Sequence, residues 1–160
     1  MGDWGTFFAA QVAASATLAG LLFVGVSLNL NRILSDPSLP DRALSGFYMF
    51  LTIMIVSSLM LLPDQPLYLL GLEVLVIALM QCATITRLDL AAMRRSTPEI
   101  RAYFVRHFAV FQSSILLYLI GAGTLVAGMH AGLYWLAAAI VFSLFNASVE
   151  AWVLLVEINR

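Results

Sequence analysis

The chain has 160 residues, of which 62% are hydrophobic and 11% are charged, and its formal net charge is −1. A soluble domain carries roughly 25% charged residues, so this composition excludes an ordinary soluble domain and predicts a protein whose partner is the lipid bilayer. The near-neutral charge argues against nucleic-acid binding, which requires a basic surface.

Hydropathy divides the chain into five apolar segments of roughly the 20 residues that a transmembrane helix needs. They are predicted near 5–30, 44–62, 66–87, 104–127 and 132–156. Helices are expected because lipid forces backbone groups to bond internally, and the segments lack the alternation of barrel strands. The predicted fold is an all-α, five-span transmembrane helical bundle, in which residues 1–160 form a single integral membrane domain.

The orientation follows from the basic residues, all eight of which are arginines. Arg32 and Arg42 follow the first span, five more lie between positions 87 and 106, and Arg160 ends the chain. Positive residues concentrate in cytoplasmic connections. We therefore predict that the N-terminus lies outside and that the C-terminus is cytoplasmic.

The first span has a stripe of small residues at helical spacing. The stripe consists of Ala9, Ala13, Ala16, Gly20 and Ser27. Small residues let helix backbones approach closely in lipid. We predict that this stripe packs against another helix and supports a homo-oligomer.

The opposite side of the same span carries Gln11, Ser15 and Asn29, interrupted by Leu18 and Leu22. One interpretation is that the polar side chains form hydrogen bonds with neighbouring helices. The other is that they line a wet path, with Leu18 and Leu22 as an apolar constriction. The spacing leaves both interpretations open.

The end of this span reads GLLFVGVSLNL from Gly20 to Leu30. This segment, with the preceding Phe7–Phe8 pair and alanine-rich run, resembles one that recurs in small uncharacterised bacterial polytopic membrane proteins. The resemblance implies a multi-pass protein of the bacterial inner (cytoplasmic) membrane. It implies no activity and no functional residues.

Glu73 lies in the third predicted span, about 10 Å from its outer end at ~1.5 Å per residue. In an oligomer, such carboxylates could form a ring that attracts cations. Alternatively, Glu73 could bond to Gln11 or Ser15 at a similar depth.

Further along the chain, Thr97-Pro98-Glu99 has the pattern of an N-cap, a first-turn proline and an acidic first turn, which predicts the start of a helix.

The fifth span carries the sharpest polar stripe of the sequence. Its members are Ser143, Asn146, Glu150 and Glu157. A carboxylate inside a membrane is costly and needs a proton, a partner or water. Glu150 is therefore either a pore or relay residue, or a structural anchor paired with Arg106 or Gln112.

The sequence contains no H-E-x-x-H, G-x-S-x-G or P-loop motif. Cys82 is the single cysteine, which leaves no disulfide framework and no thiolate metal site. We expect no catalytic residues, no cofactor and no metal, and hence no enzyme.

The leading functional hypothesis is a homo-oligomeric pore or channel that transports a small inorganic ion. Its candidate pore-lining residues are Asn146, Glu150, Ser143, Glu73, Gln11 and Ser15, with Leu18 and Leu22 as the constriction. The alternative is a non-transporting accessory or regulatory subunit of a larger membrane complex.

Overall fold

The computed structural model describes the backbone of residues 2–35, 39–95 and 98–158, and the side chains of 4–35, 39–91 and 108–156. Six helices occupy these residues: α1 Gly2–Leu28, α2 Leu30–Ser35, α3 Leu39–Leu59, α4 Leu67–Arg95, α5 Pro98–Val126 and α6 Ala131–Ile158. Five of them, all but α2, are long and apolar enough to cross a membrane. The protein is therefore a multi-pass membrane protein with an all-α fold, as the hydropathy predicts.

The helix boundaries confirm some predictions and correct others. α5 begins at Pro98, as the proline and the acidic residue after it predict. The first span is predicted to continue to residue 30, but α1 ends at Leu28 and the short helix α2 follows. At this break the Asn29 side chain donates to the Gly25 carbonyl at 2.9 Å, and the Asn29 carbonyl accepts from the Arg32 and Ile33 amides.

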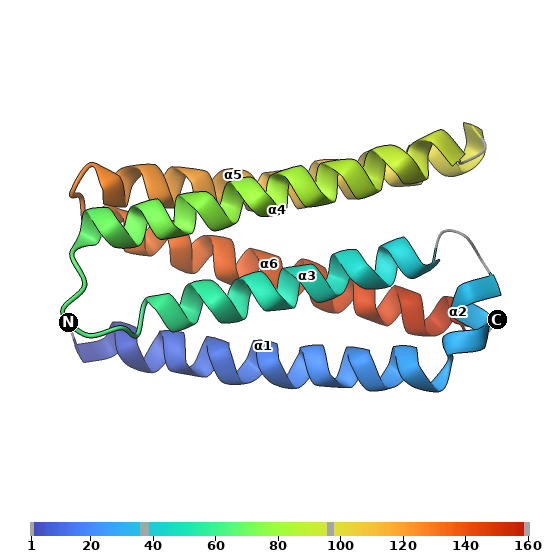
Figure 1. The fold of residues 1–160 in the computed structure, drawn as a ribbon, viewed down its shortest axis with the longest axis horizontal. Helices are drawn as coiled ribbons and strands as arrows, with labels where there is room; N and C mark the ends of the chain where they lie inside the picture. Colours follow the sequence, from blue (N-terminus) through green and yellow to red (C-terminus); the bar gives the residue numbers. More distant parts are fainter. Residues whose placement is uncertain (1, 36–38, 96–97, 159–160) are drawn as a thin grey trace.

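The long helices are arranged with α1 on one side, the α4–α5 pair on the other, and α3 and α6 between them (Figure 1). The N-terminus and the α3–α4 and α5–α6 turns lie at one end, which we call the N-terminal end (Figure 1). α2 and the C-terminus lie at the opposite, C-terminal end (Figure 1). Gly128 in the α5–α6 turn has φ +77°, a conformation that glycine adopts without the steric cost of a Cβ atom.

The core consists of two apolar clusters that follow each other along the bundle. The N-terminal cluster includes Phe8, Ile53, Val74, Tyr118 and Leu136. The C-terminal cluster includes Leu22, Phe50, Ile85, Phe111 and Leu154. Since both clusters draw on α1, α3, α4, α5 and α6, the long helices surround a shared interior.

Glycines set the close packing of α4, α5 and α6. A Cβ atom on Gly71 of α4 would lie 2.7 Å from the Val126 amide nitrogen, and one on Gly132 of α6 would lie 2.8 Å from the Gly121 carbonyl oxygen. Both distances are shorter than van der Waals contact, so these helices approach each other where a side chain is missing.

Candidate functional site

The polar stripe predicted on the fifth span points into the bundle. Ser143 and Asn146 of α6 are buried, at 1% and 8% exposure, and Glu150 is half-buried. The side chain of Glu157, the last member of the stripe, lies outside the described residues. Residues three and four apart share one face of a helix, and α6 turns this face toward its neighbours in the same chain.

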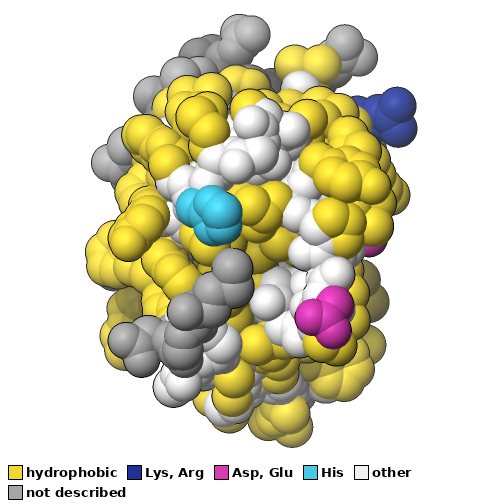
Figure 2. Space-filling model, turned by 90° about the vertical axis from the view of Figure 1, so that its left-hand side faces the viewer, with side chains coloured by type: hydrophobic (Ala, Val, Ile, Leu, Met, Phe, Trp, Pro, Cys, Tyr) yellow, Lys and Arg dark blue, Asp and Glu magenta, His cyan; other side chains and the backbone are white. Residues whose placement is uncertain are grey.

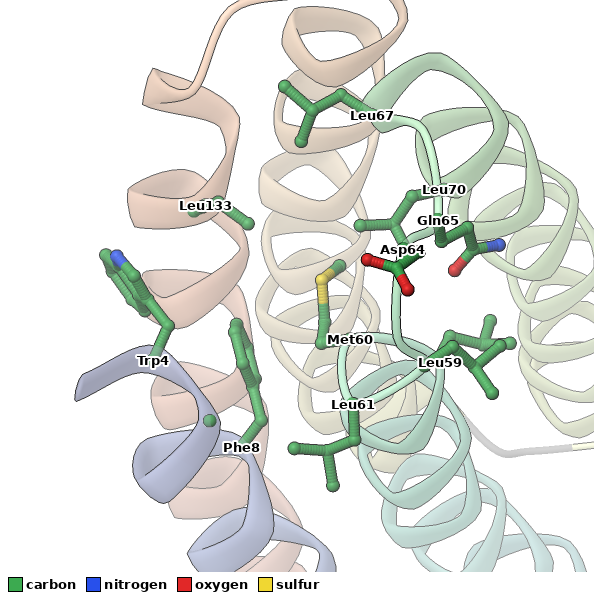
Figure 3. Close-up of a pocket in the computed structure, with 12 residues that line it drawn as sticks. Trp4, Phe8, Leu59, Met60, Leu61, Asp64, Gln65, Leu67, Leu70 and Leu133 are labelled. Atoms are coloured by element: carbon green, nitrogen blue, oxygen red, sulfur yellow. The ribbon is translucent and has the colours of Figure 1, made fainter. Parts of the chain in front are cut away.

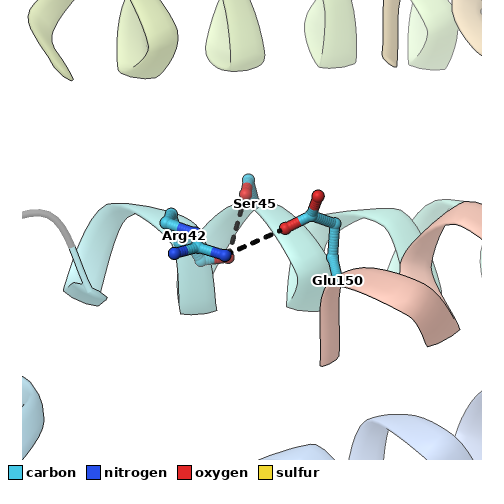
Figure 4. A network of polar contacts seen from close by, with 3 residues as sticks. All are labelled: Arg42, Ser45 and Glu150. Carbon is cyan, nitrogen blue, oxygen red and sulfur yellow. Dashed lines mark hydrogen bonds and ion pairs between the residues drawn. The ribbon is translucent and has the colours of Figure 1, made fainter. Parts of the chain in front are cut away.

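Glu150 forms an ion pair with Arg42 of α3 near the C-terminal end of the bundle (Figure 4). The Arg42 Nη2 and Glu150 Oε2 atoms are 3.5 Å apart, and both side chains are largely buried. One turn further along α3, the Ser45 hydroxyl donates to the Arg42 carbonyl at 2.9 Å. The carboxylate that the sequence marks as costly in a membrane therefore has an internal counter-charge.

Arg42 is not one of the two partners considered from the sequence. Gln112 instead donates from Nε2 to the Thr86 hydroxyl at 2.7 Å, and the Cys82 thiol lies 3.7 Å from its Oε1. The Arg106 side chain lies outside the described residues. Arg42 was overlooked because hydropathy begins the second span at residue 44, whereas α3 begins at Leu39 and includes Arg42 in its first turns.

Buried polar side chains lie between residues of the two apolar clusters along α1, α4, α5 and α6, and we call them the polar layer. We define it by five side chains that are at most 8% exposed: Ser15, Gln81, Ser114, Ser143 and Asn146. Asn146 Nδ2 donates to the Ser114 hydroxyl at 3.3 Å, whereas the Ser143 hydroxyl has no hydrogen-bond partner among the described residues. Each member falls between apolar residues of the two clusters on its own helix, as Gln81 does between Ala78 and Ile85.

Gln81, like Ser143, lacks side-chain hydrogen bonds to the described residues, and it buries two polar atoms in this layer. Its side chain is 2% exposed, and within the described part of the chain neither Nε2 nor Oε1 has a hydrogen-bond partner. An amide buried without hydrogen bonds costs roughly 1–3 kcal/mol by mutational measures. The sequence gives no stronger signal for Gln81 than its polarity within an apolar span.

The polar residues of the first span also face the interior. Ser15 is fully buried and donates to the Gln11 carbonyl at 2.7 Å, while Gln11 itself is half-buried. Leu18 and Leu22, the constriction candidates, pack in the C-terminal cluster. This side of α1 therefore contacts other helices of the same bundle.

The small-residue stripe of α1 points outward. Between positions 4 and 20, every exposed residue is a glycine, an alanine or a threonine. We call this set the smooth face: Gly5, Thr6, Ala9, Ala10, Ala13, Ala16, Thr17 and Gly20. By contrast, α6 exposes large side chains such as Phe142, Phe145 and Trp152.

Glu73 of α4 lies near the N-terminal end and is half-buried. Gln65, in the turn before α4, donates from Nε2 to Glu73 Oε2 at 2.6 Å. This contact differs from the bond to Gln11 or Ser15 considered from the sequence. The carboxylate thus ties the α3–α4 turn to the first turns of α4.

Among the described residues, no three His, Cys, Asp or Glu side chains are grouped as metal ligands. What the geometry does bring together is a set of internal polar pairs and one outward face without large side chains. Comparison of the chain with known protein families, with characterised proteins and with solved structures gives no significant match.

Proposed function

We propose that the protein is a self-associating accessory or regulatory subunit of a larger membrane complex, and that it does not itself transport an ion. The observation that carries the proposal is the smooth face of α1, the outward surface between positions 4 and 20 that exposes only Gly, Ala and Thr. Transmembrane helices associate mainly through close van der Waals packing, for which small residues are favourable.

The polar interior supports the accessory role over the pore. Glu150 has Arg42 as a counter-charge within the same chain, and Asn146 donates to Ser114. A pore along the axis of an oligomer would be lined by outward faces, and these side chains point inward. Internal pairing of this kind is what structural anchors require.

A second copy of the chain is the simplest occupant of the smooth face. Two copies inserted in the same direction are related by an axis normal to the membrane, so that equivalent residues of α1 meet across it. The smooth face is compatible with this contact because no side chain larger than threonine separates the two backbones.

The proposed cellular setting is the bacterial inner membrane, with the N-terminal end outside. The arginine distribution supports this orientation, because positive residues favour the cytoplasmic side. The segment from Gly20 to Leu30 resembles one in bacterial polytopic proteins, and this resemblance supports the proposed location in the bacterial inner membrane.

Cysteine cross-linking in native membranes tests the contact. In a Cys82→Ala background, Ala13→Cys is expected to form a disulfide-linked dimer under mild oxidation. Val141→Cys, on the exposed side of α6 at a comparable distance from the N-terminal end, is the matched control and is expected to remain monomeric. Equal cross-linking at both positions, or none at Ala13→Cys, would overturn the proposed contact.

The pore remains a second candidate because the buried amide of Gln81 in the polar layer has no hydrogen-bond partner among the described residues. A water-filled path through the bundle would supply the hydrogen bonds that this amide lacks. Potassium flux into proteoliposomes distinguishes the two functions. The accessory role predicts that this flux is no greater than the flux into protein-free liposomes. Flux that Gln81→Met abolishes would establish the pore and exclude the accessory proposal.

A further inference from the structure

A pocket of about 530 Å³ opens at the N-terminal end, between α1, the α3–α4 turn, α4 and α6 (Figure 3). The face at this end of the molecule is mostly hydrophobic and shows few charged side chains (Figure 2). A volume of this size lies in the range of roughly 300–1,000 Å³ that is typical of sites for small molecules. It is too small for a macromolecular partner.

The walls of the pocket are apolar and partly aromatic. They include Trp4, Phe8, Leu59, Met60, Leu70 and Leu133. The Trp4 ring stacks on Phe8 with centroids 5.8 Å apart and meets Tyr134 edge-on at 4.9 Å. These contacts hold the indole ring in place at the pocket wall.

Asp64 is the single charged residue among the described side chains that line the pocket. It is exposed and its φ is 55°, a left-handed conformation that aspartate tolerates better than most residues. Figure 3 shows its carboxylate directed into the space between Met60 and Leu70. The neighbouring Gln65 is engaged with Glu73, so Asp64 supplies the charge of the pocket.

We propose that this pocket binds a small amphiphile that has one positively charged amine and a single apolar chain. The carboxylate of Asp64 would pair with the amine, and the apolar walls would enclose the chain. The volume favours a single-chain amine over a two-chain lipid.

The test uses octylammonium and 1-octanol, which share the same apolar chain and differ in charge at neutral pH. In a Trp135→Phe, Trp152→Phe background, Trp4 is the remaining tryptophan and its fluorescence reports binding. We expect both compounds to bind in detergent, with octylammonium about two- to fivefold tighter, the range of a solvent-exposed ion pair. Equal affinities for octylammonium and 1-octanol in this Trp135→Phe, Trp152→Phe protein would overturn the proposal.

Asp64→Asn removes the charge and keeps the shape, and asparagine also tolerates a positive φ. This variant is expected to lose the two- to fivefold preference while it binds octanol unchanged. If the preference persists in Asp64→Asn, the assignment of this carboxylate is overturned.

Gly5→Leu tests the location of the site. Gly5 lines the pocket, and a Cβ atom there meets nothing within 4 Å, as is also true of Gly123 on α5, which does not line the pocket. Leucine at position 5 takes the space of at least two ligand methylenes, so both compounds should bind about tenfold more weakly. Gly123→Leu is the matched control; equal losses in the two variants would exclude this pocket as the site.

Nanodiscs distinguish a small amine from a lipid headgroup. The octylammonium preference should be the same in phosphatidylglycerol nanodiscs with and without phosphatidylethanolamine. A preference that disappears only when phosphatidylethanolamine is present would assign the pocket to the lipid and overturn the small-amine assignment. Gly5 belongs to both the smooth face and the pocket, but Ala13 does not line the pocket. Cross-linking at Ala13→Cys and the octylammonium preference, which depends on Asp64, can therefore fail separately.

Discussion

Two glutamines on neighbouring helices differ in whether their amides have partners. Gln112 of α5 donates to Thr86, whereas the buried amide of Gln81 on α4 has no partner among the described residues. Gln112→Met should therefore lower the free energy of unfolding by about 0.6–1 kcal/mol. Gln81→Met should raise it by about 1 kcal/mol, because it removes polar atoms that make no bond.

Thermal unfolding of both variants in the same detergent measures this difference in sign. Each change replaces an amide by a thioether of similar volume, so each variant is the other's control. A loss of stability in Gln81→Met would mean that the amide has a partner, such as water, that the described residues do not supply. That result would strengthen the pore candidate.

The ion pair between Arg42 and Glu150 is suited to a double-mutant cycle. Removal of one member leaves a buried charge, which costs about 3–5 kcal/mol in a fully buried pair. Because Glu150 retains 16% exposure, we expect a loss of roughly 2–3 kcal/mol for Arg42→Met or Glu150→Met alone. The double variant should recover most of that loss, and chemical unfolding of the three variants measures it.

Additive losses of stability in the double variant would contradict the proposed coupling of Arg42 and Glu150, because two independent residues do not compensate each other. Glu150→Met is also expected to leave proteoliposome flux at the background level. If the single substitutions change flux and not stability, the pair acts as a relay and not as an anchor.

The candidate site was partly predictable at this scale. The helical spacing of Ser143, Asn146 and Glu150 correctly indicates one shared face, because the period of 3.6 residues depends on the sequence alone. The partners Arg42 and Ser114 were not predictable, because contacts between helices depend on how the bundle closes. Gln81 could be seen only as a polar residue in an apolar run.

Among the helices, the contact between α4 and α5 depends on Gly71, whose added Cβ atom would lie 2.7 Å from the Val126 amide nitrogen. Gly71→Ala should force the two helices apart and lower the free energy of unfolding by about 1–3 kcal/mol, the usual cost of overpacking. Gly123→Ala on α5, where the space is empty, is the control. It should be neutral or slightly stabilising, because alanine favours the helix.

Unfolding of both variants in guanidinium or by heat checks the contrast. An equal effect at the two positions would mean that helix propensity, and not the close approach of α4 and α5, governs the response to alanine.

The elements themselves were largely predictable. The onset of α5 at Pro98 follows from local chemistry that any helix start obeys. α2 was missed because hydropathy detects long apolar runs, whereas this short helix begins where Asn29 bonds back to α1. The second span was predicted to begin at residue 44, which is later than the start of α3 at Leu39. The prediction was late because Asp41 and Arg42 lower the local hydropathy.

For the whole molecule, the orientation in the membrane stays a prediction from the arginines. His130→Cys in the α5–α6 turn should react with a membrane-impermeant maleimide in intact cells, because the N-terminal end is predicted to be outside. Leu34→Cys on the exposed side of α2 should react only after permeabilisation. Cys82→Ala provides the background, and the reverse pattern of labelling would contradict the orientation.

The environment of each helix face was harder to predict than the number of helices. The number follows from length and hydropathy, which the bilayer thickness fixes. On α1, both the polar side and the small-residue side are unfavourable toward lipid, so the sequence could not decide which of them the protein itself covers. The structure covers the polar side and exposes the smooth face.

Native mass spectrometry of the protein in nanodiscs tests the central claim of self-association through α1 most directly. The account predicts a dimer for the wild-type chain and a shift to monomer in Ala13→Leu, since leucine separates the two smooth faces. Gly123→Leu is the control and should remain dimeric. A monomeric wild-type protein, or a ring of four or more subunits that Ala13→Leu leaves intact, would contradict the account.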